Sequence, residues 1–324
     1  MRLAHVSLAV SLGLLAGAPA SGQDFPSRPI TIVVPFGPGG TDTYARLLAP
    51  KMTEKLGHPT IIENVGGAGG SIGALRVATA KPDGHTLLMG NLGTQVLNAG
   101  LDARLRYDPR RDFAPVSLVA NDHLTFVVKK ETSAANLREF VAHLRANPGK
   151  VSFSTAGAGS VSHVSCALLL HQNGVTTTHV PYKAFAAAMQ DVIRGEVDFT
   201  CGLPGTVKPF IEAGSLKGFA FTGPTRSPLL PSVPTTAEAG FPSYLVNSWN
   251  ALFAPKGTPR LIVEKLNAAV RENFDDPEIQ KKFVALGAIV PKPEERNPEH
   301  LARLVEADLN LWLPIMKSMA LTRD

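Results

Sequence analysis

Three glycine-rich turns constrain the fold of this chain more than any other feature of its sequence. They cover residues 35–42 (PFGPGGTD), 66–73 (GGAGGSIG) and 154–160 (STAGAGS), and each joins an apolar run to a segment with helical spacing. Glycine lets backbone N–H groups approach a ligand closely, next to the positive N-terminus of the following helix. The turns therefore predict anion sites built from main chain, and none of them carries the catalytic residues that such turns often serve.

The order of the expected strands and helices predicts an α/β fold. The first part of the chain alternates strand and helix at residues 30–34, 41–56, 60–63, 71–80 and 85–89. Consecutive βαβ units form a parallel sheet that helices cover. The alternation begins again with a strand at 123–129 and continues to a strand at 216–221, which predicts a second sheet.

A proline-rich stretch at residues 223–242 follows this second unit and excludes a regular element there. A short apolar segment at 249–254 and three helices come after it, so we expect the chain to return to its first domain. The length also favours two domains over one core. We predict two lobes with a ligand cleft between them, lobe one being residues 24–121 plus 230–324 and lobe two residues 122–229.

The first residues predict an export signal. Arg2 precedes an apolar run at residues 3–16, and Ala18-Pro-Ala20 offers a cleavage site. The run is short for a membrane span, although an uncleaved anchor is the alternative. We expect residues 1–22 to be a signal peptide that is cleaved near 20–23, and the mature protein to be exported.

Composition excludes several classes of function. The formal net charge is +5, and the basic residues are scattered rather than gathered into a stripe with aromatic residues, so we expect no nucleic-acid partner. No Cys/His cluster has metal-ligand spacing, so we expect neither a metal nor a cofactor. Cys166 and Cys201 are the two cysteines. The sequence favours two buried, unpaired thiols, and export leaves a disulfide as the open alternative.

A series of motifs gives the chain a family resemblance. In order, they are Phe25-Pro-Ser-Arg-Pro29, the run from Ile32 to Asp42, the run from Glu63 to Gly73, Lys81-Pro-Asp-Gly84, the run from Ser154 to His163, His179-Val-Pro-Tyr-Lys183, Gly195-Glu-Val-Asp198 and Phe253-Ala-Pro-Lys-Gly-Thr-Pro259. Together they resemble the Bug-type periplasmic substrate-binding proteins of tripartite tricarboxylate transporters, over nearly all of the mature chain. Ala184, Cys201-Gly202 and Ala251 depart from the family pattern, which leaves the identity of the ligand open.

The resemblance implies two α/β lobes that close on a small organic mono- or dicarboxylate, held largely by backbone amides and water. It also implies a periplasmic location and delivery to membrane transporter subunits or a sensor kinase. We expect a monomer. The candidate ligand-binding residues are Phe36, Gly37, Gly39, Gly40, Thr41, Gly69, Thr155, Ala156, Gly157, Gly159, Ser160, Tyr182 and Lys183.

Two enzymatic interpretations of the same motifs are weaker. The second turn has Ile72 where a dinucleotide fingerprint needs its third glycine. Ser160 and His163 lack the nucleophile elbow of a hydrolase, and we expect Ser160 to cap a helix and His163 to bond locally. We therefore predict a binding protein and no enzyme, with an exported hydrolase or isomerase acting on a small carboxylic acid as the alternative.

Overall fold

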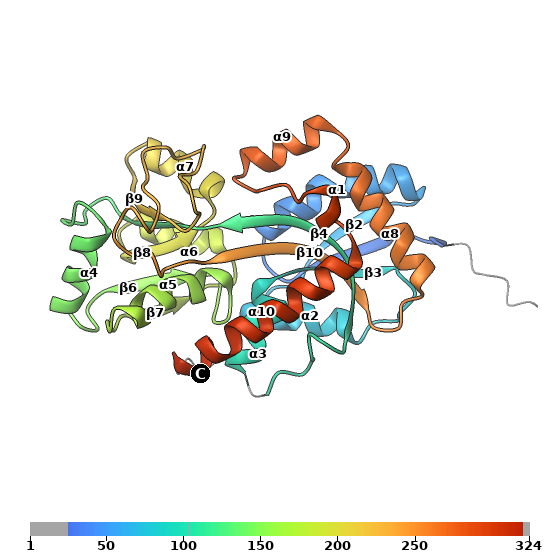
Figure 1. The fold of residues 1–324 in the computed structure, drawn as a ribbon, viewed down its shortest axis with the longest axis horizontal. Coiled ribbons are helices and arrows are strands. Elements are labelled where there is room, and N and C mark those ends of the chain that lie inside the picture. Colours follow the sequence, from blue (N-terminus) through green and yellow to red (C-terminus); the bar gives the residue numbers. More distant parts are fainter. Residues whose placement is uncertain (1–24, 103, 320–324) are drawn as a thin grey trace, which may run out of the picture.

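The protein consists of two lobes, each built on a five-stranded sheet that helices cover (Figure 1). The computed structural model describes residues 25–102 and 104–319, so the predicted signal peptide lies outside the described residues. The strand orders are β2-β1-β3-β10-β4 in lobe one and β7-β6-β8-β5-β9 in lobe two. This arrangement confirms the predicted α/β two-lobe fold.

Lobe one uses both ends of the described chain. Its elements are β1 (Ile30–Val34), α1 (Thr41–Leu56), β2 (Thr60–Asn64), α2 (Ser71–Ala78), β3 (Thr86–Asn91), α3 (Asn98–Leu101), β4 (Phe113–His123), β10 (Asn247–Pro255), α8 (Arg260–Asn273), α9 (Pro277–Ala285) and α10 (Pro298–Ser318). Buried side chains of β1, β3 and β10 pack against α1 and α8 to form one core.

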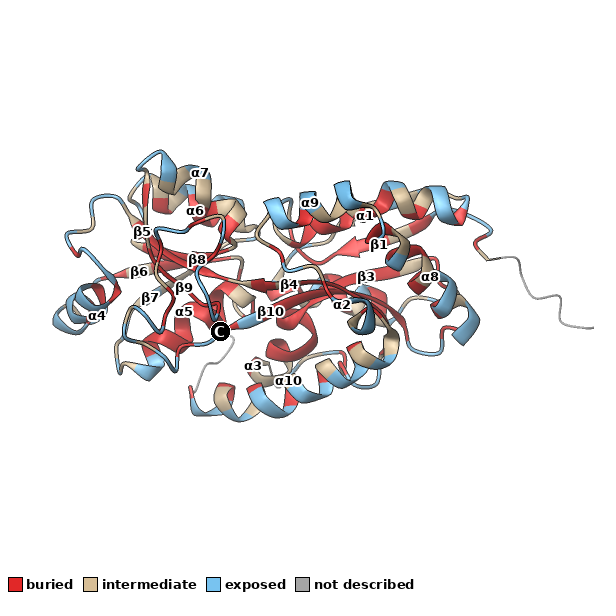
Figure 2. Ribbon diagram, turned by 45° about the horizontal axis from the view of Figure 1, so that its top comes forward, coloured by how far each residue is buried: buried red, intermediate tan, exposed pale blue. Residues whose placement is uncertain are grey.

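Lobe two is formed by the middle of the chain. Its elements are β5 (Thr125–Lys129), α4 (Leu137–Ala146), β6 (Ser152–Thr155), α5 (Val161–Gln172), β7 (Thr178–Pro181), α6 (Phe185–Ile193), β8 (Phe199–Gly202), α7 (Pro204–Glu212) and β9 (Leu216–Phe221). In both lobes the central strands are buried, the edge strands β2 and β7 are partly exposed, and the outer faces of the helices are exposed (Figure 2).

Each sheet is mainly parallel and contains one antiparallel strand. In lobe one that strand is β10, which pairs antiparallel with β3 and β4; in lobe two it is β5, which pairs antiparallel with β8 and β9. Both are the first strand that the chain forms after it crosses from the other lobe. The first crossing is bonded to the end of β9, because Leu124 and Thr222 each donate a backbone N–H to the other residue, at 2.9 Å.

Strand β4 is the main element that sequence reasoning missed. A single strand was expected at residues 123–129, whereas β4 and β5 are separate strands on either side of Leu124. Pro115 lies inside β4 and argues against a strand in the middle of a sheet. The proline is accommodated because β4 is the edge strand of its sheet.

The exact lobe boundaries stay a prediction. Residues 230–236 continue alongside β9, since the Phe221 N–H donates to Pro234 O at 2.8 Å and the Thr236 N–H donates to Phe221 O at 2.9 Å. The second crossing therefore runs through residues closer to β10.

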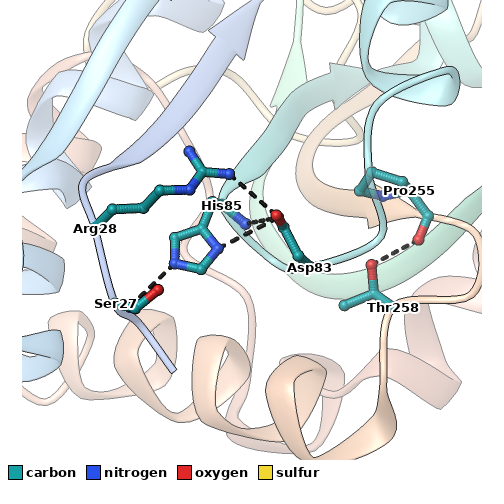
Figure 3. Close-up of polar contacts among 6 residues, drawn as sticks. All are labelled: Ser27, Arg28, Asp83, His85, Pro255 and Thr258. Carbon is teal, nitrogen blue, oxygen red and sulfur yellow. Dashed lines mark hydrogen bonds and ion pairs between the residues drawn. The ribbon is translucent and has the colours of Figure 1, made fainter. Parts of the chain in front are cut away.

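Polar contacts fix the segment that leads into β1 (Figure 3). The Ser27 N–H donates to His85 Nε2 at 3.2 Å, and Arg28 forms an ion pair with Asp83 at 3.0 Å. Asp83 also accepts from the backbone N–H of His85, at 3.0 Å. These contacts join the start of β1 to the turn before β3, which pairs with it in the sheet.

The interpretation of Cys166 and Cys201 as unpaired thiols is wrong. The two residues form a disulfide that joins α5 to β8, with their Cα atoms 6.0 Å apart and both side chains fully buried. Their separation of 35 residues in the sequence gives no sign of this proximity. It arises because α5 packs directly on β8.

Candidate functional site

A cavity of about 100 Å³ lies between the two lobes. Lobe one contributes Phe36, Gly37, Gly39, Gly40, Thr41, Asn91, Asp122, Ser248 and Asn250 to its wall. Lobe two contributes Ala156, Ser160, Val161, Ser162, Phe185, Cys201, Gly202, Leu203 and Thr206, and Leu124 lies at the crossing. Of the predicted ligand-binding residues, the cavity brings together Phe36, Gly37, Gly39, Gly40, Thr41, Ala156 and Ser160.

The first glycine turn leaves its amides open. Gly39 and Gly40 have φ of 98° and 56°, which favours glycine, and a Cβ on either would meet nothing within 4 Å. Within the described residues, the backbone N–H groups of Gly39, Gly40 and Thr41 have no hydrogen-bond acceptor. These amides lie at the start of α1 and are free to bind an anion.

Asp42 follows the first glycine turn but does not cap helix α1. Helix α1 begins after Gly40 without a side-chain cap. Asp42 instead accepts hydrogen bonds from Arg46 Nε and Asn64 Nδ2, both at 2.9 Å. Both oxygens of its carboxylate are thereby bonded to side chains of lobe one.

The third glycine turn uses its amides internally. Ala156 N–H donates to Ser162 Oγ at 3.1 Å, Gly157 N–H to Thr155 Oγ1 at 3.1 Å, and Gly159 N–H to His163 Nδ1 at 3.2 Å. Ser160 caps α5 as expected, since its Oγ accepts from the His163 N–H at 3.3 Å.

The open amides of lobe two belong to residues just after the predicted ones, which end at Ser160. Val161 and Ser162 line the cavity at the start of α5, and their backbone N–H groups have no acceptor among the described residues. Both residues come directly after the glycine turn at residues 154–160. The unsatisfied N–H groups in the first turn of any helix are the signal that could have identified them.

Several glycines bring the backbones of the two lobes together instead of lining the cavity. A Cβ on Gly157 would lie 3.3 Å from Gly69 N, and a Cβ on Gly159 would overlap the Asn98 side chain. Asn98 Nδ2 also donates to Gly69 O at 3.0 Å. Gly69, Gly157 and Gly159 therefore permit close contact between the lobes, whereas Gly37 both lines the cavity and lies against Ala184.

Thr155, Tyr182 and Lys183 are not part of the cavity wall. Thr155 Oγ1 shares a 2.6 Å hydrogen bond with His179 Nε2. The Tyr182 hydroxyl donates to Asp191, and burial together with this bond raises the pKa of Tyr182 to about 12. Lys183 is exposed.

A buried polar network under the first turn was missed by sequence reasoning. Tyr44 Oη donates to Asp122 Oδ1 and Asn250 Nδ2 donates to Asp122 Oδ2, both at 2.6 Å. Thr41 Oγ1 donates to Asn250 Oδ1 at 2.8 Å, so this hydroxyl proton is already used within the protein. Burial raises the pKa of Asp122 to about 6. Polar residues at the end of β4 and within the apolar run of β10 are the signal for this network.

The electrostatic character of the cavity comes from the main chain. The first residues of α1, α5 and α6 and the residue before α7 all lie in its wall. The cavity-lining residues include no lysine, arginine or histidine, and Asp122 is their one acidic side chain. Helix N-termini carry partial positive charge, so the cavity favours an anion without a cationic side chain.

The same wall lacks a pair of groups for acid–base catalysis. Catalysis of that kind needs a titratable group within reach of the reacting atoms and, for a covalent step, an activated nucleophile. Asp122 is held by Tyr44 and Asn250, and Cys201 is part of a disulfide. His163 accepts from Gly159 and stacks on His179, with the ring centroids 4.2 Å apart.

Similar proteins share this architecture. MatC from Rhodopseudomonas palustris with bound malate is 41% identical, with a TM-score of 0.87, and the match covers 90% of this chain and 100% of that one. An R. palustris protein with adipate is 33% identical, with a TM-score of 0.86 and coverage of 93% and 100%. Protein BugT of Bordetella pertussis is 32% identical over 93% of this chain and 92% of its own length.

No helix in residues 25–102 or 104–319 has the length and apolar character that a membrane span requires. Residues 44–321 match the family described as tripartite tricarboxylate transporter family receptor. With a two-lobe fold, a cavity that offers main-chain amides and relatives that are solute-binding proteins, the chain belongs to this family of periplasmic binding proteins and is not an enzyme.

Proposed function

We propose that this protein captures a small organic carboxylate between its lobes and delivers it to a tripartite tricarboxylate-type transporter. The observation that carries the proposal is the pair of open amide groups on opposite walls of the cavity. Gly39 to Thr41 supply one set from lobe one, and Val161 and Ser162 supply the other from lobe two. A carboxylate that accepts from both sets stabilises the closed arrangement of the lobes.

The proposed site extends beyond the residues in the cavity wall. Phe36, Gly37, Gly39, Gly40, Thr41, Ala156 and Ser160 are proposed to surround the ligand. Gly69, Gly157, Gly159 and the backbone of Lys183 are proposed to support the closed contact between the lobes, and Thr155 and Tyr182 to hold this part of lobe two in place. We also propose that the mature protein is periplasmic, that residues 1–22 are removed on export, and that the membrane partner is the transporter rather than a sensor kinase.

The size and chemistry of the cavity support a small ligand. Its volume of about 100 Å³ is suited to a short carbon skeleton. Malate and adipate are bound to two of the similar proteins. The apolar side chains of Phe36, Leu124 and Phe185 provide contact for the carbon skeleton, while the amides bind the acid group.

Isothermal titration calorimetry tests the proposal directly. The protein is unfolded and refolded to remove any ligand acquired during expression, and is then titrated with mono- and dicarboxylates of two to six carbons. We expect one site with a Kd of about 0.1–10 μM, which corresponds to roughly 7–10 kcal/mol. Mass spectrometry should recover the ligand unchanged after long incubation. Absence of binding by every carboxylate, or steady conversion of one, would overturn the proposal.

A further inference from the structure

Asp122 is an unusual residue to find in the wall of an anion-binding cavity. Only 1% of its surface is exposed, and it is the one ionisable side chain among the residues that line the cavity. A buried carboxylate is costly unless hydrogen bonds or an opposite charge compensate for its lost hydration. No lysine, arginine or histidine lines the cavity to provide that charge.

The protein itself meets only part of the hydrogen-bonding capacity of this carboxylate. Oδ1 accepts from Tyr44 Oη and Oδ2 accepts from Asn250 Nδ2. An ionised carboxylate can accept about four hydrogen bonds through its two oxygens. Asp122 therefore has unused acceptor capacity, and the residue lies in the wall of the cavity.

The two residues that already bond to Asp122 cannot supply a further donor. Asn250 Oδ1 accepts a hydrogen bond from Thr41 Oγ1. This bond orients the side-chain amide so that Nδ2 faces Asp122. Tyr44 has a single hydroxyl proton, and Asp122 already receives it. A hydroxyl or ammonium group of a bound ligand would provide a further donor for Asp122.

We propose that Asp122 is a specificity-determining residue that accepts a hydrogen bond from a hydroxyl or ammonium group of the ligand. The proposal rests on the proposed function, because the amides of Gly39 to Thr41 and of Val161 and Ser162 hold the ligand's carboxylate. The preferred ligand is then a hydroxy- or amino-substituted carboxylate. A carboxylate without such a donor leaves Asp122 buried with incomplete hydrogen bonding. Its affinity for the site should therefore be much lower.

Matched ligands test the proposal. Calorimetry compares propionate with lactate and alanine, and succinate with malate and aspartate, so that each set differs only in a hydroxyl or ammonium group. In at least one set we expect the substituted ligand to bind at least tenfold more tightly to the wild-type protein. Comparison of the hydroxyl ligands with the ammonium ligands shows which donor Asp122 prefers.

Two variants distinguish a direct role from a structural one. Asp122→Asn is nearly isosteric and removes the charge, and we expect the preference to fall below threefold. Tyr44→Phe disturbs the same network but keeps the Asp122 carboxylate. The affinities for the plain and the substituted ligand should therefore fall by the same factor, and the preference between them should remain. If Asp122→Asn does not unfold cooperatively, Asp122→Ser replaces it, since its small side chain leaves room for water.

The possible failures are separable. Binding of plain carboxylates with equal affinity for their substituted analogues would overturn the role of Asp122 and leave the proposed function intact. A preference that survives in Asp122→Asn or Asp122→Ser would also overturn it. Failure of every carboxylate to bind would instead overturn the proposed function.

Discussion

The first and third glycine turns approach one cavity from opposite lobes, yet they use their backbones differently. Residues 35–42 leave the amides of Gly39, Gly40 and Thr41 without acceptors. In residues 154–160, the side chains of Thr155, Ser162 and His163 accept the amides of the turn. A glycine-rich sequence is therefore insufficient evidence of an anion site, because side chains close in sequence can already satisfy its amides.

The glycines of the two turns also differ in what surrounds them. A Cβ on Gly39 or Gly40 would enter open space, whereas a Cβ on Gly157 or Gly159 would meet lobe one. The first turn thus leaves room for a ligand, and the third turn leaves room for the opposite lobe. Substitutions at the two turns should consequently affect binding by different routes.

Gly40→Leu is expected to have the largest effect. Gly40 has φ 56° and ψ −118°, a conformation that is strained for any other residue by about 1–3 kcal/mol. The leucine side chain would also occupy the cavity. We expect ligand affinity to fall at least 100-fold in calorimetry, with cooperative unfolding retained.

The matched control is Gly149→Leu. Gly149 also has a positive φ, of 73°, and open space around its Cβ, but it does not line the cavity. It should lower stability and leave affinity unchanged. Equal affinity in wild type and Gly40→Leu would remove the first turn from the site.

Asp122 gives the lobe-one wall a dependence on pH that the lobe-two wall lacks. Burial raises its pKa from 3.8 to about 6 in the folded protein. Between pH 4 and pH 6 the folded protein keeps this proton, whereas the unfolded chain releases it. The free energy of unfolding is therefore highest below pH 4 and falls as the pH rises through 6. The loss is on the order of 3 kcal/mol. Urea unfolding of ligand-free wild type and Asp122→Asn from pH 4 to 7 measures it.

We expect the variant to become progressively more stable relative to wild type as pH rises across this range. A constant difference between the two proteins would show that Asp122 does not titrate there. Tyr44→Phe serves as the comparison, because it keeps the carboxyl group and should retain the pH dependence.

Gly205→Ala tests the contact between lobes without changing the cavity wall. Gly205 N–H donates to Leu286 O at 3.1 Å, which joins α7 of lobe two to the end of α9 in lobe one. A Cβ would lie 2.6 Å from backbone atoms of Leu286. Since alanine favours a helix over glycine, the ligand-free protein should be as stable as wild type or more stable. Ligand affinity should fall about tenfold, as the closed form is penalised.

Small-angle X-ray scattering should show that Gly205→Ala compacts less on saturation with ligand. Glu212→Ala, an exposed change at the other end of α7, should leave both measurements unchanged. Wild-type affinity in Gly205→Ala would mean that this contact can relax at no cost to closure.

The sequence predicts the elements of this fold better than it predicts the site. Apolar periodicity identifies β1, α1, α2 and β3 within a few residues, because burial in each follows from local pattern. The site depends on which amides remain unsatisfied, and that is decided by hydrogen bonds such as Gly159 to His163. Residues such as Asp122 and Asn250 meet only after the sheet has formed, since 128 positions separate them.

Lys183→Ala is expected to have the smallest effect, although the sequence makes this residue a candidate partner for the ligand's carboxylate. The side chain is exposed and lies outside the cavity wall. At physiological ionic strength a solvated ammonium contributes little to binding a charge beyond direct contact. We expect calorimetry to show less than a twofold change in affinity. Lys150→Ala, which removes an exposed lysine of the same lobe, controls for the change in net charge. A tenfold loss in Lys183→Ala, absent in Lys150→Ala, would show that this lysine reaches the ligand and that lobe two binds it with a side-chain cation as well as with amides.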